Sequence, residues 1–141
     1  MTVEQVKLVQ ITFEEIKPVS AAAAQLFYSR LFQLCPSLRQ LFPVDIQPQR
    51  QKLIQALSMV VGSLETPEDI IPAIQAMAKR HSSYGVRDED YAVFGAALLW
   101  TLEQALGPSW NAAVREAWTA LYESVARVMK SAASQSHRAE A

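Results

Sequence analysis

The sequence predicts an all-helical fold, and three observations support this prediction. Apolar residues recur at helical spacing along almost the whole chain of 141 residues. Prolines and glycines interrupt this pattern where helices are expected to end. No segment shows the alternation of apolar and polar residues that marks a half-buried strand. About seven helices with short connections leave no room for a sheet, so we expect one all-α domain.

Two helices are expected before the first proline-rich break. Thr2 with Gln5 matches a capping box, in which side chains and backbone amides of the first helical turn bond reciprocally. Apolar residues then follow at helical spacing up to Pro18. Ser20 is expected to cap the second helix, and Pro36 to end it and to open a short helical turn.

The middle of the chain predicts two more helices after an irregular corner at 42–48. Pro48 is expected to open the first of them. The stretch "TPED" predicts the start of the second, with Thr66 as N-cap, proline at the first position and two acids near the positive end of the helix dipole. Gly85 suits the left-handed conformation that closes this helix.

The C-terminal third predicts two long helices. Asp88 is expected to cap the first, which the stretch "LGPS" breaks. The last helix is expected to run from about Trp110 to Lys130. Polar residues dominate the end of the chain, so we divide it into a domain at 1–132 and a polar tail at 133–141.

Composition limits the classes of function. The net charge of −1 lacks the basic excess of a nucleic-acid surface. No apolar run could span a bilayer and the N-terminus lacks the apolar block of a signal peptide, so we expect a cytoplasmic protein. One cysteine, Cys35, excludes an internal disulfide and fits a reducing compartment. The sequence lacks a glycine-rich phosphate loop, a close Cys or His metal pair and a Ser-His-Asp set, which leaves hydrolytic chemistry without a candidate.

His81, in the stretch "AMAKRHSSYGV", lies on the apolar face of its expected helix. It follows Ile70, Ile74 and Met77 at the spacing i, i+4, i+7 and i+11. A lone histidine on such a face is more often an ordinary half-buried side chain than a ligand. The other histidine, His137, lies in the polar tail. This pattern alone leaves both interpretations of His81 open.

Two stretches of the sequence resemble the globin family. The run "LFYSRLFQLCPSLRQLF", followed by "KRHSSYGV" and by a helix opening near Tyr91, is similar to bacterial single-domain haemoglobins and to the haem domain of flavohaemoglobins. The resemblance covers about residues 3–130 and depends on the order and spacing of the motifs. It implies a globin fold of about seven helices that encloses haem b.

The resemblance assigns a role to each matching residue. His81 matches the proximal ligand of the haem iron. Tyr28 and Gln49 match the distal residues that act on bound O₂, and they are the expected catalytic pair. Phe42 matches the phenylalanine that packs on the haem face, and Tyr91 matches a proximal tyrosine. The other haem-contacting residues that it implies are Lys52, Leu53, Leu57, Met77, Arg80, Tyr84, Val86 and Phe94.

These residue types suit the implied chemistry. O₂ held by a haem carries negative charge, so a donor such as Tyr28 or Gln49 would stabilise it by about 1–3 kcal/mol in a dry pocket. The second nitrogen of the His81 ring is expected to bond a backbone carbonyl one turn back, near Met77. The family's late proximal glutamate is a departure, because its position falls at or near Ala133 here.

The resemblance therefore implies a cytoplasmic b-type haemoglobin with high O₂ affinity. Its expected reaction is oxidation of nitric oxide to nitrate by bound O₂, with re-reduction by a separate enzyme, and carbon monoxide is a further expected ligand. Neither nucleic acid nor a membrane is an expected partner. Two alternatives remain: a haem-based gas sensor or O₂ store, and a globin-fold interaction module without haem, in which His81 would be incidental.

Overall fold

Six α-helices and four short 3₁₀ helices make up the described part of the chain in the computed structural model, which describes the backbone of residues 1–140 and the side chains of residues 1–134. The α-helices are α1 (Val3–Ile16), α2 (Ser20–Leu34), α3 (Gln47–Gly62), α4 (Ile71–Ser83), α5 (Asp90–Leu106) and α6 (Ala112–Glu140). The 3₁₀ helices are η1 (Lys17–Val19), η2 (Pro36–Leu41), η3 (Pro67–Asp69) and η4 (Gly107–Ser109). No strand occurs in residues 1–140, which confirms the all-α prediction.

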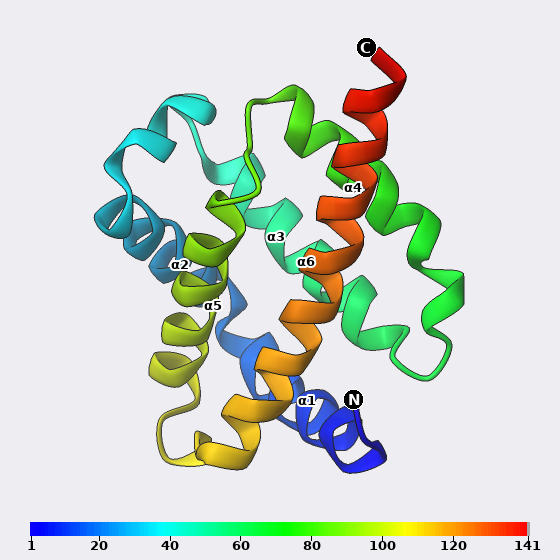
Figure 1. The fold of residues 1–141 in the computed structure, drawn as a ribbon. Helices are drawn as coiled ribbons and strands as arrows, with labels where there is room; N and C mark the ends of the chain where they lie inside the picture. Colours follow the sequence, from blue (N-terminus) through cyan, green and yellow to red (C-terminus); the bar gives the residue numbers. More distant parts are fainter. Residues whose placement is uncertain (141) are drawn as a thin grey trace.

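Three helix pairs form the frame of the fold (Figure 1). α4 packs along α6, α2 packs along α5, and α1 packs against the first half of α6. α3 packs on α2 and, less extensively, on α1. Although α3 and α4 follow one another in sequence, they do not pack closely together in the described structure. The helices that contain Gln49 and His81 are thus held by different neighbours.

The contact between α1 and α6 contains the most deeply buried aromatic residue of the core. Trp118 is 1 % exposed, and its indole Nε1–H donates to Thr12 Oγ1 at 2.9 Å. The Thr12 hydroxyl in turn donates to the carbonyl of Leu8 at 2.7 Å, so both buried polar groups are satisfied. The Phe13 ring lies 6.4 Å from the Trp118 ring. Burial of each large apolar side chain contributes about 1.5–3 kcal/mol, which fixes α1 on α6.

The first two helix starts were predicted with different success. Gln5 N–H donates to Thr2 Oγ1 at 3.0 Å and Thr2 N–H donates to Gln5 Oε1 at 2.9 Å, which confirms the capping box. The prediction that Ser20 caps α2 is wrong, because Val19 is the N-cap and no side chain bonds there. η1 leads directly into α2, and the Ser20 amide donates to the carbonyl of Lys17. The carbonyl of Lys17 therefore accepts a hydrogen bond at the start of α2, where a side-chain cap was expected.

Two further caps were also predicted wrongly. Thr66 makes no side-chain cap, and "TPED" forms only η3 before α4 begins at Ile71. Pro72 lacks an amide hydrogen and restricts the residue before it, which explains the break. Asp88 does not cap α5 either, because the buried Asp90 carboxylate accepts from the Arg87 amide at 2.9 Å instead.

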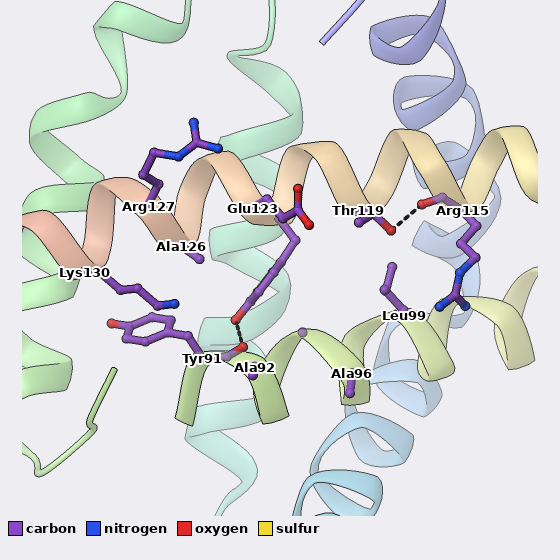
Figure 2. Close-up of a pocket in the computed structure, with 12 residues that line it drawn as sticks. Tyr91, Ala92, Ala96, Leu99, Arg115, Thr119, Glu123, Ala126, Arg127 and Lys130 are labelled. Atoms are coloured by element: carbon purple, nitrogen blue, oxygen red, sulfur yellow. Dashed lines mark hydrogen bonds between the residues drawn. The ribbon is translucent and has the colours of Figure 1, made fainter. Parts of the chain in front are cut away.

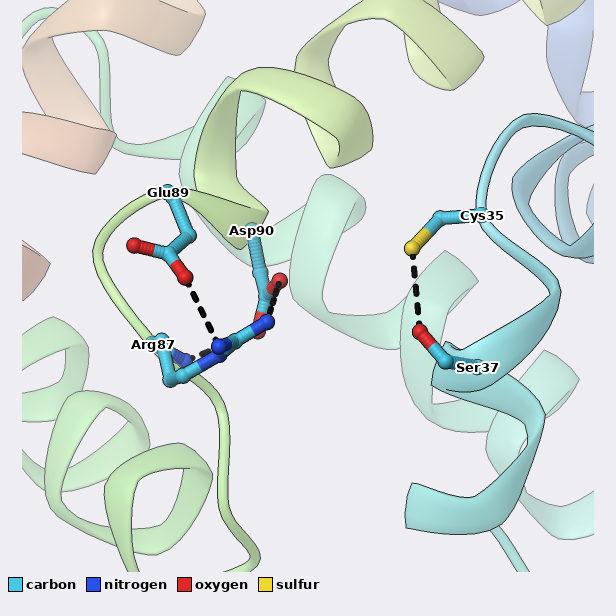
Figure 3. A network of polar contacts seen from close by, with 5 residues as sticks. All are labelled: Cys35, Ser37, Arg87, Glu89 and Asp90. Carbon is cyan, nitrogen blue, oxygen red and sulfur yellow. Dashed lines mark hydrogen bonds and ion pairs between the residues drawn. The ribbon is translucent and has the colours of Figure 1, made fainter.

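The charged segment before α5 is held by this carboxylate (Figure 3). Arg87 Nη1 lies 2.8 Å from Glu89 Oε1, and Arg87 Nη2 lies 3.7 Å from Asp90 Oδ1. Asp90 is only 3 % exposed, so its amide bond contributes more than the exposed pair with Glu89. The segment thereby enters α5 in a fixed direction.

The last helix is longer than predicted. α6 continues to Glu140, and Ala132 and Ala133 are buried, so the expected end near Lys130 is wrong. The side chain of His137 lies outside the described residues. Within the described residues, none of the helices combines the length and the apolar character that crossing a membrane would need.

Candidate functional site

The His81 ring is held by the main chain of its own helix. Its Nδ1 lies 2.7 Å from the carbonyl oxygen of Met77, which confirms the predicted bond one turn back. Because a carbonyl can only accept, Nδ1 carries the hydrogen and Nε2 keeps a lone pair. Burial lowers the pKa of His81, the Met77 carbonyl opposes this change, and the charge of Arg80 adds to it. The neutral imidazole, which is the metal-binding form, is therefore favoured.

α4 closes immediately after His81. The Val86 amide donates to the carbonyl of His81 at 3.0 Å, and the Gly85 amide donates to that of Ser82 at 3.1 Å. Gly85 has a φ of 99°, as the pattern for helix closure requires. The predicted role of Gly85 is confirmed, and the closure fixes the helical turn from which His81 projects.

Tyr28 and Gln49 are in direct contact. The Tyr28 hydroxyl donates to the backbone carbonyl of Gln49 at 3.2 Å, which is longer than the roughly 2.7–2.8 Å usual for hydroxyl donors. Burial raises the pKa of Tyr28 to about 12, so the phenol stays protonated and can donate near neutral pH. The long distance indicates a weak bond that the hydroxyl can exchange for another acceptor.

An aromatic cluster orients Tyr28. Its ring meets Phe27 edge-on at 5.0 Å and Phe42 edge-on at 5.6 Å, and Phe32 lies 6.1 Å away. Phe32 and Phe42 also meet at 5.6 Å. Edge-to-face pairs stabilise by about 0.5–1.5 kcal/mol beyond their buried area. The cluster joins α2 to the corner after η2.

Arg39, which the sequence analysis did not single out, holds that corner in place. Its guanidinium donates to the carbonyls of Phe42, Pro43 and Val44 at 3.3, 2.8 and 2.9 Å. It also lies 5.3 Å from the centre of the Phe32 ring. Arg39 therefore positions Phe42, and an arginine just before an irregular, proline-containing corner was the available signal.

The remaining predicted site residues differ in exposure. Five are partly buried and pack against the core: Leu53, Leu57, Met77, Val86 and Phe94. Lys52 and Arg80 are exposed, and Tyr84 is 60 % exposed. Among the described side chains, no ring contact or hydrogen bond joins the cluster around Tyr28 to His81. The structure thus brings Tyr28, Phe42 and Gln49 together, with His81 on a separate helix.

Tyr91 is tied to α6. The Tyr122 hydroxyl donates to the Tyr91 carbonyl at 2.7 Å, and the Lys130 ammonium lies 5.9 Å from the centre of the Tyr91 ring. On α5, the Tyr91 ring meets Phe94 edge-on at 6.0 Å. Burial, followed by the charges of the neighbouring Asp88 and Asp90, raises the pKa of Tyr91 to about 12.

Tyr122 was missed by the sequence analysis. It lies one turn after Trp118, and this spacing was the available signal. Ala133, at or near which the resemblance places the family's glutamate, is buried. Within the described residues, no three His, Cys, Asp or Glu side chains gather as a metal cluster.

Residues 25–129 match the Globin family, and the chain therefore belongs to the globin family. It is 32 % identical over 125 residues to a flavohemoprotein of Bordetella parapertussis, covering 86 % of this chain and 31 % of that protein. It is 28 % identical over 131 residues to a flavohemoprotein of Vibrio cholerae, covering 91 % of this chain and 33 % of that protein. The chain thus spans about a third of the length of these curated relatives.

Two solved structures have the same fold. A bacterial globin from Campylobacter jejuni superposes with a TM-score of 0.86 at 21 % identity, covering 97 % of this chain and 99 % of that one. An engineered carbene transferase from Rhodothermus marinus, named as a candidate nitric oxide dioxygenase, gives a TM-score of 0.90 at 24 % identity. That match covers 99 % of this chain and 97 % of the other. Together they confirm the predicted globin fold.

Proposed function

We propose that this globin binds haem b through His81 and uses it to hold O₂ tightly and to oxidise nitric oxide to nitrate. The observation that supports this best is the His81–Met77 bond, because it directs the lone pair of Nε2 away from the helix backbone. When bound, haem supplies the iron for O₂ and for electron transfer. A separate reductase would return the protein to its active state, and the activity belongs in the cytoplasm.

The described residues fit a haem. A flat apolar plate needs partly exposed apolar side chains, and those of Leu53, Leu57, Met77 and Phe94 have that intermediate burial. The exposed cations Lys52 and Arg80 lie on α3 and α4, where they can meet carboxylates at the solvent edge. A single imidazole is the protein ligand that such a group requires.

Tyr28 and Gln49 supply donors on the opposite side. The Tyr28 hydroxyl gives up a long bond to a carbonyl when it turns toward a negatively polarised ligand, so the exchange costs little. Gln49 can contribute its side-chain amide, because its contact with Tyr28 uses the main chain. Carbon monoxide gains less from such donors than O₂ does, which would favour O₂ over carbon monoxide.

Two measurements test the proposal. The purified chain should show a strong Soret band with one haem b per chain, and a colourless protein that does not take up haem would overturn the haem assignment. Oxygenated protein mixed with nitric oxide should give nitrate stoichiometrically, and sustained turnover should need an added reductase. Release of O₂ in place of nitrate would contradict the dioxygenase assignment and leave gas binding or sensing.

The relatives' names support the same proposal. The relatives named flavohemoprotein match this chain over about a third of their own length. One protein with the same fold is named as a candidate nitric oxide dioxygenase. The contact between Tyr28 and Gln49 and the bond from His81 to Met77 are a separate line of support from the residues themselves. An interaction module without haem would need none of these three side chains in these positions.

A further inference from the structure

A groove runs between α5 and α6 on a face that contains neither Tyr28 nor Gln49 (Figure 2). Its volume is about 520 Å³, which lies within the range of about 300–1,000 Å³ typical of small-molecule sites. Small and apolar residues form much of its lining: Ala92, Gly95, Ala96, Leu99 and Ala126.

Gly95 explains why the groove has this shape. A Cβ atom at Gly95 would lie 2.7 Å from Cε2 of Tyr122, so only glycine lets that ring cross to α5. The Tyr122 hydroxyl then donates to the Tyr91 carbonyl, which holds the two helices together at one end of the groove. Next to this crossing, the short side chains of Ala92 and Ala96 are exposed and leave the space open.

Charged side chains are placed unevenly along the groove. Arg115 lies at one end and Lys130 at the other, and their separation of 15 positions in the sequence corresponds to roughly 22 Å of helix. Glu123 lies between the two ends, and Arg127 lies one turn before Lys130. No ion pair forms among these four in the described structure, so their charges are not neutralised by one another.

Lys130 is directed into the groove. Its chain reaches toward α5 and its ammonium lies 5.9 Å from the centre of the Tyr91 ring, whereas Arg127 extends from the other side of α6 (Figure 2). An ammonium over a ring face keeps donors for an anion as well. Glu123 repels a negative group in the middle of the groove, so an anion is favoured only near the ends.

We propose that this groove binds a single-chain amphiphile, with its carboxylate on Lys130 and its hydrocarbon chain along Ala92, Ala96 and Leu99. The apolar lining suits the chain, the length of the groove suits an extended molecule, and the cation at its end suits the head group. A helix from a partner protein would find few large aliphatic side chains to pack against, because Leu99 is the one such residue in the lining. The groove shares Tyr91 with the side on which the resemblance places the proximal tyrosine, but binding of an amphiphile there does not require haem.

Calorimetric titration with dodecanoate tests the proposal on the protein as purified, saturated with carbon monoxide so that any haem ligand site is occupied. Wild-type protein should bind one dodecanoate per chain, and Lys130→Gln should weaken binding about tenfold or more. Ala96→Trp, at an exposed position, should fill the groove and abolish binding. Lys7→Gln and Ala22→Trp are matched controls at exposed positions of α1 and α2, and they should bind as wild type does.

Three outcomes would overturn the proposal. Unchanged dodecanoate binding in Ala96→Trp would place the ligand elsewhere, and equal binding of dodecanol would remove the role of Lys130. A chain that binds no dodecanoate but forms a dimer that Ala96→Trp disrupts would assign the groove to a second copy of the chain. Because calorimetry reports binding directly, the result does not depend on nitric oxide chemistry.

Discussion

The two sides of the candidate site are held in different ways. On the side of α4, α5 and α6, short bonds to backbone carbonyls fix the side chains, at 2.7 Å for His81 to Met77 and 2.7 Å for Tyr122 to Tyr91. On the side of α2 and α3, Tyr28 is oriented by aromatic rings and makes one longer bond of 3.2 Å, to Gln49.

This difference matches what each side would have to do. A ligand to a bound metal must hold one orientation, and the His81 bond within its own helix provides that. A donor to a gas must turn toward a ligand that arrives and leaves, and the long bond of Tyr28 permits it. We therefore expect the side chain on α4 to keep one orientation and the side chain on α2 to exchange its hydrogen-bond partner. Four experiments test this expectation.

The largest expected effect comes from removing the fixed imidazole. His81→Ala should abolish stable haem binding, because it removes the only ligand that we assign to the metal. Absorbance at the Soret band and haem content per chain measure this directly. The matched control is His137→Ala, which should bind haem as wild type does. Full haem occupancy with an unchanged spectrum in His81→Ala would show that the ligand is misassigned.

The second prediction concerns the stability of the protein at alkaline pH and the buried phenol of Tyr28 on α2. The pKa of Tyr28 is raised to about 12 in the folded protein, so its stability contribution is complete below pH 10 and is lost as pH rises toward 12. The rise of the Tyr28 pKa from 10.0 to about 12 corresponds to about 2.7 kcal/mol of folding free energy. Urea unfolding between pH 8 and 11 should therefore show a shallower loss of stability in Tyr28→Phe. Identical pH slopes in the two proteins would contradict this.

The third prediction tests the packing of α5 on α6, away from the expected iron ligand His81. Gly95→Ala should lower the free energy of unfolding by about 1–3 kcal/mol, because the new Cβ meets the Tyr122 ring at 2.7 Å. Gly62→Ala is a matched control, since no atom lies within 4 Å of its Cβ position. That control should be neutral or stabilise by about 0.4–1 kcal/mol. If both variants changed the free energy of unfolding by the same amount, α5 and α6 would be able to move apart at Gly95 at little cost.

The smallest expected effect is on gas release. Tyr28→Phe and Gln49→Leu should each raise the O₂ dissociation rate about tenfold, which corresponds to ~1.4 kcal/mol. The two effects should not add, because both donors act on one small ligand. Gln49→Leu keeps the carbonyl that Tyr28 contacts, so it tests the amide alone. Stopped-flow kinetics measure these rates, and unchanged values in both variants would remove the distal assignment.

Features within one helical turn could be predicted from the sequence. The Thr2–Gln5 capping box, the closure at Gly85 and the bond from His81 to the Met77 carbonyl all form as expected. Each depends on residues three to five apart, whose relative positions a helix fixes by itself. The all-α fold follows from the same local periodicity, repeated along the chain.

Features that depend on the path of the chain between helices could not be predicted in this way. Asp88 lies just before α5 and Asp90 is its first residue, and only the turn at Arg87 decides that the Asp90 carboxylate, and not that of Asp88, accepts a backbone amide there. The bond from Tyr28 to Gln49 crosses the corner after η2, and its acceptor is a backbone atom that every residue has. The crossing of Tyr122 over Gly95 requires the packing of α5 on α6 to be known first.

The closed end of α4 limits the ways in which His81 can move. The amides of Gly85 and Val86 hold the final turn, so displacing the imidazole by unwinding that turn alone would first have to break both bonds. Any displacement along the direction of Nε2 must then be shared by the whole of α4, which packs along α6. A force on the His81 ring would therefore cause α4 to slide slightly along α6, and it would not cause a hinge motion in the loop after α4.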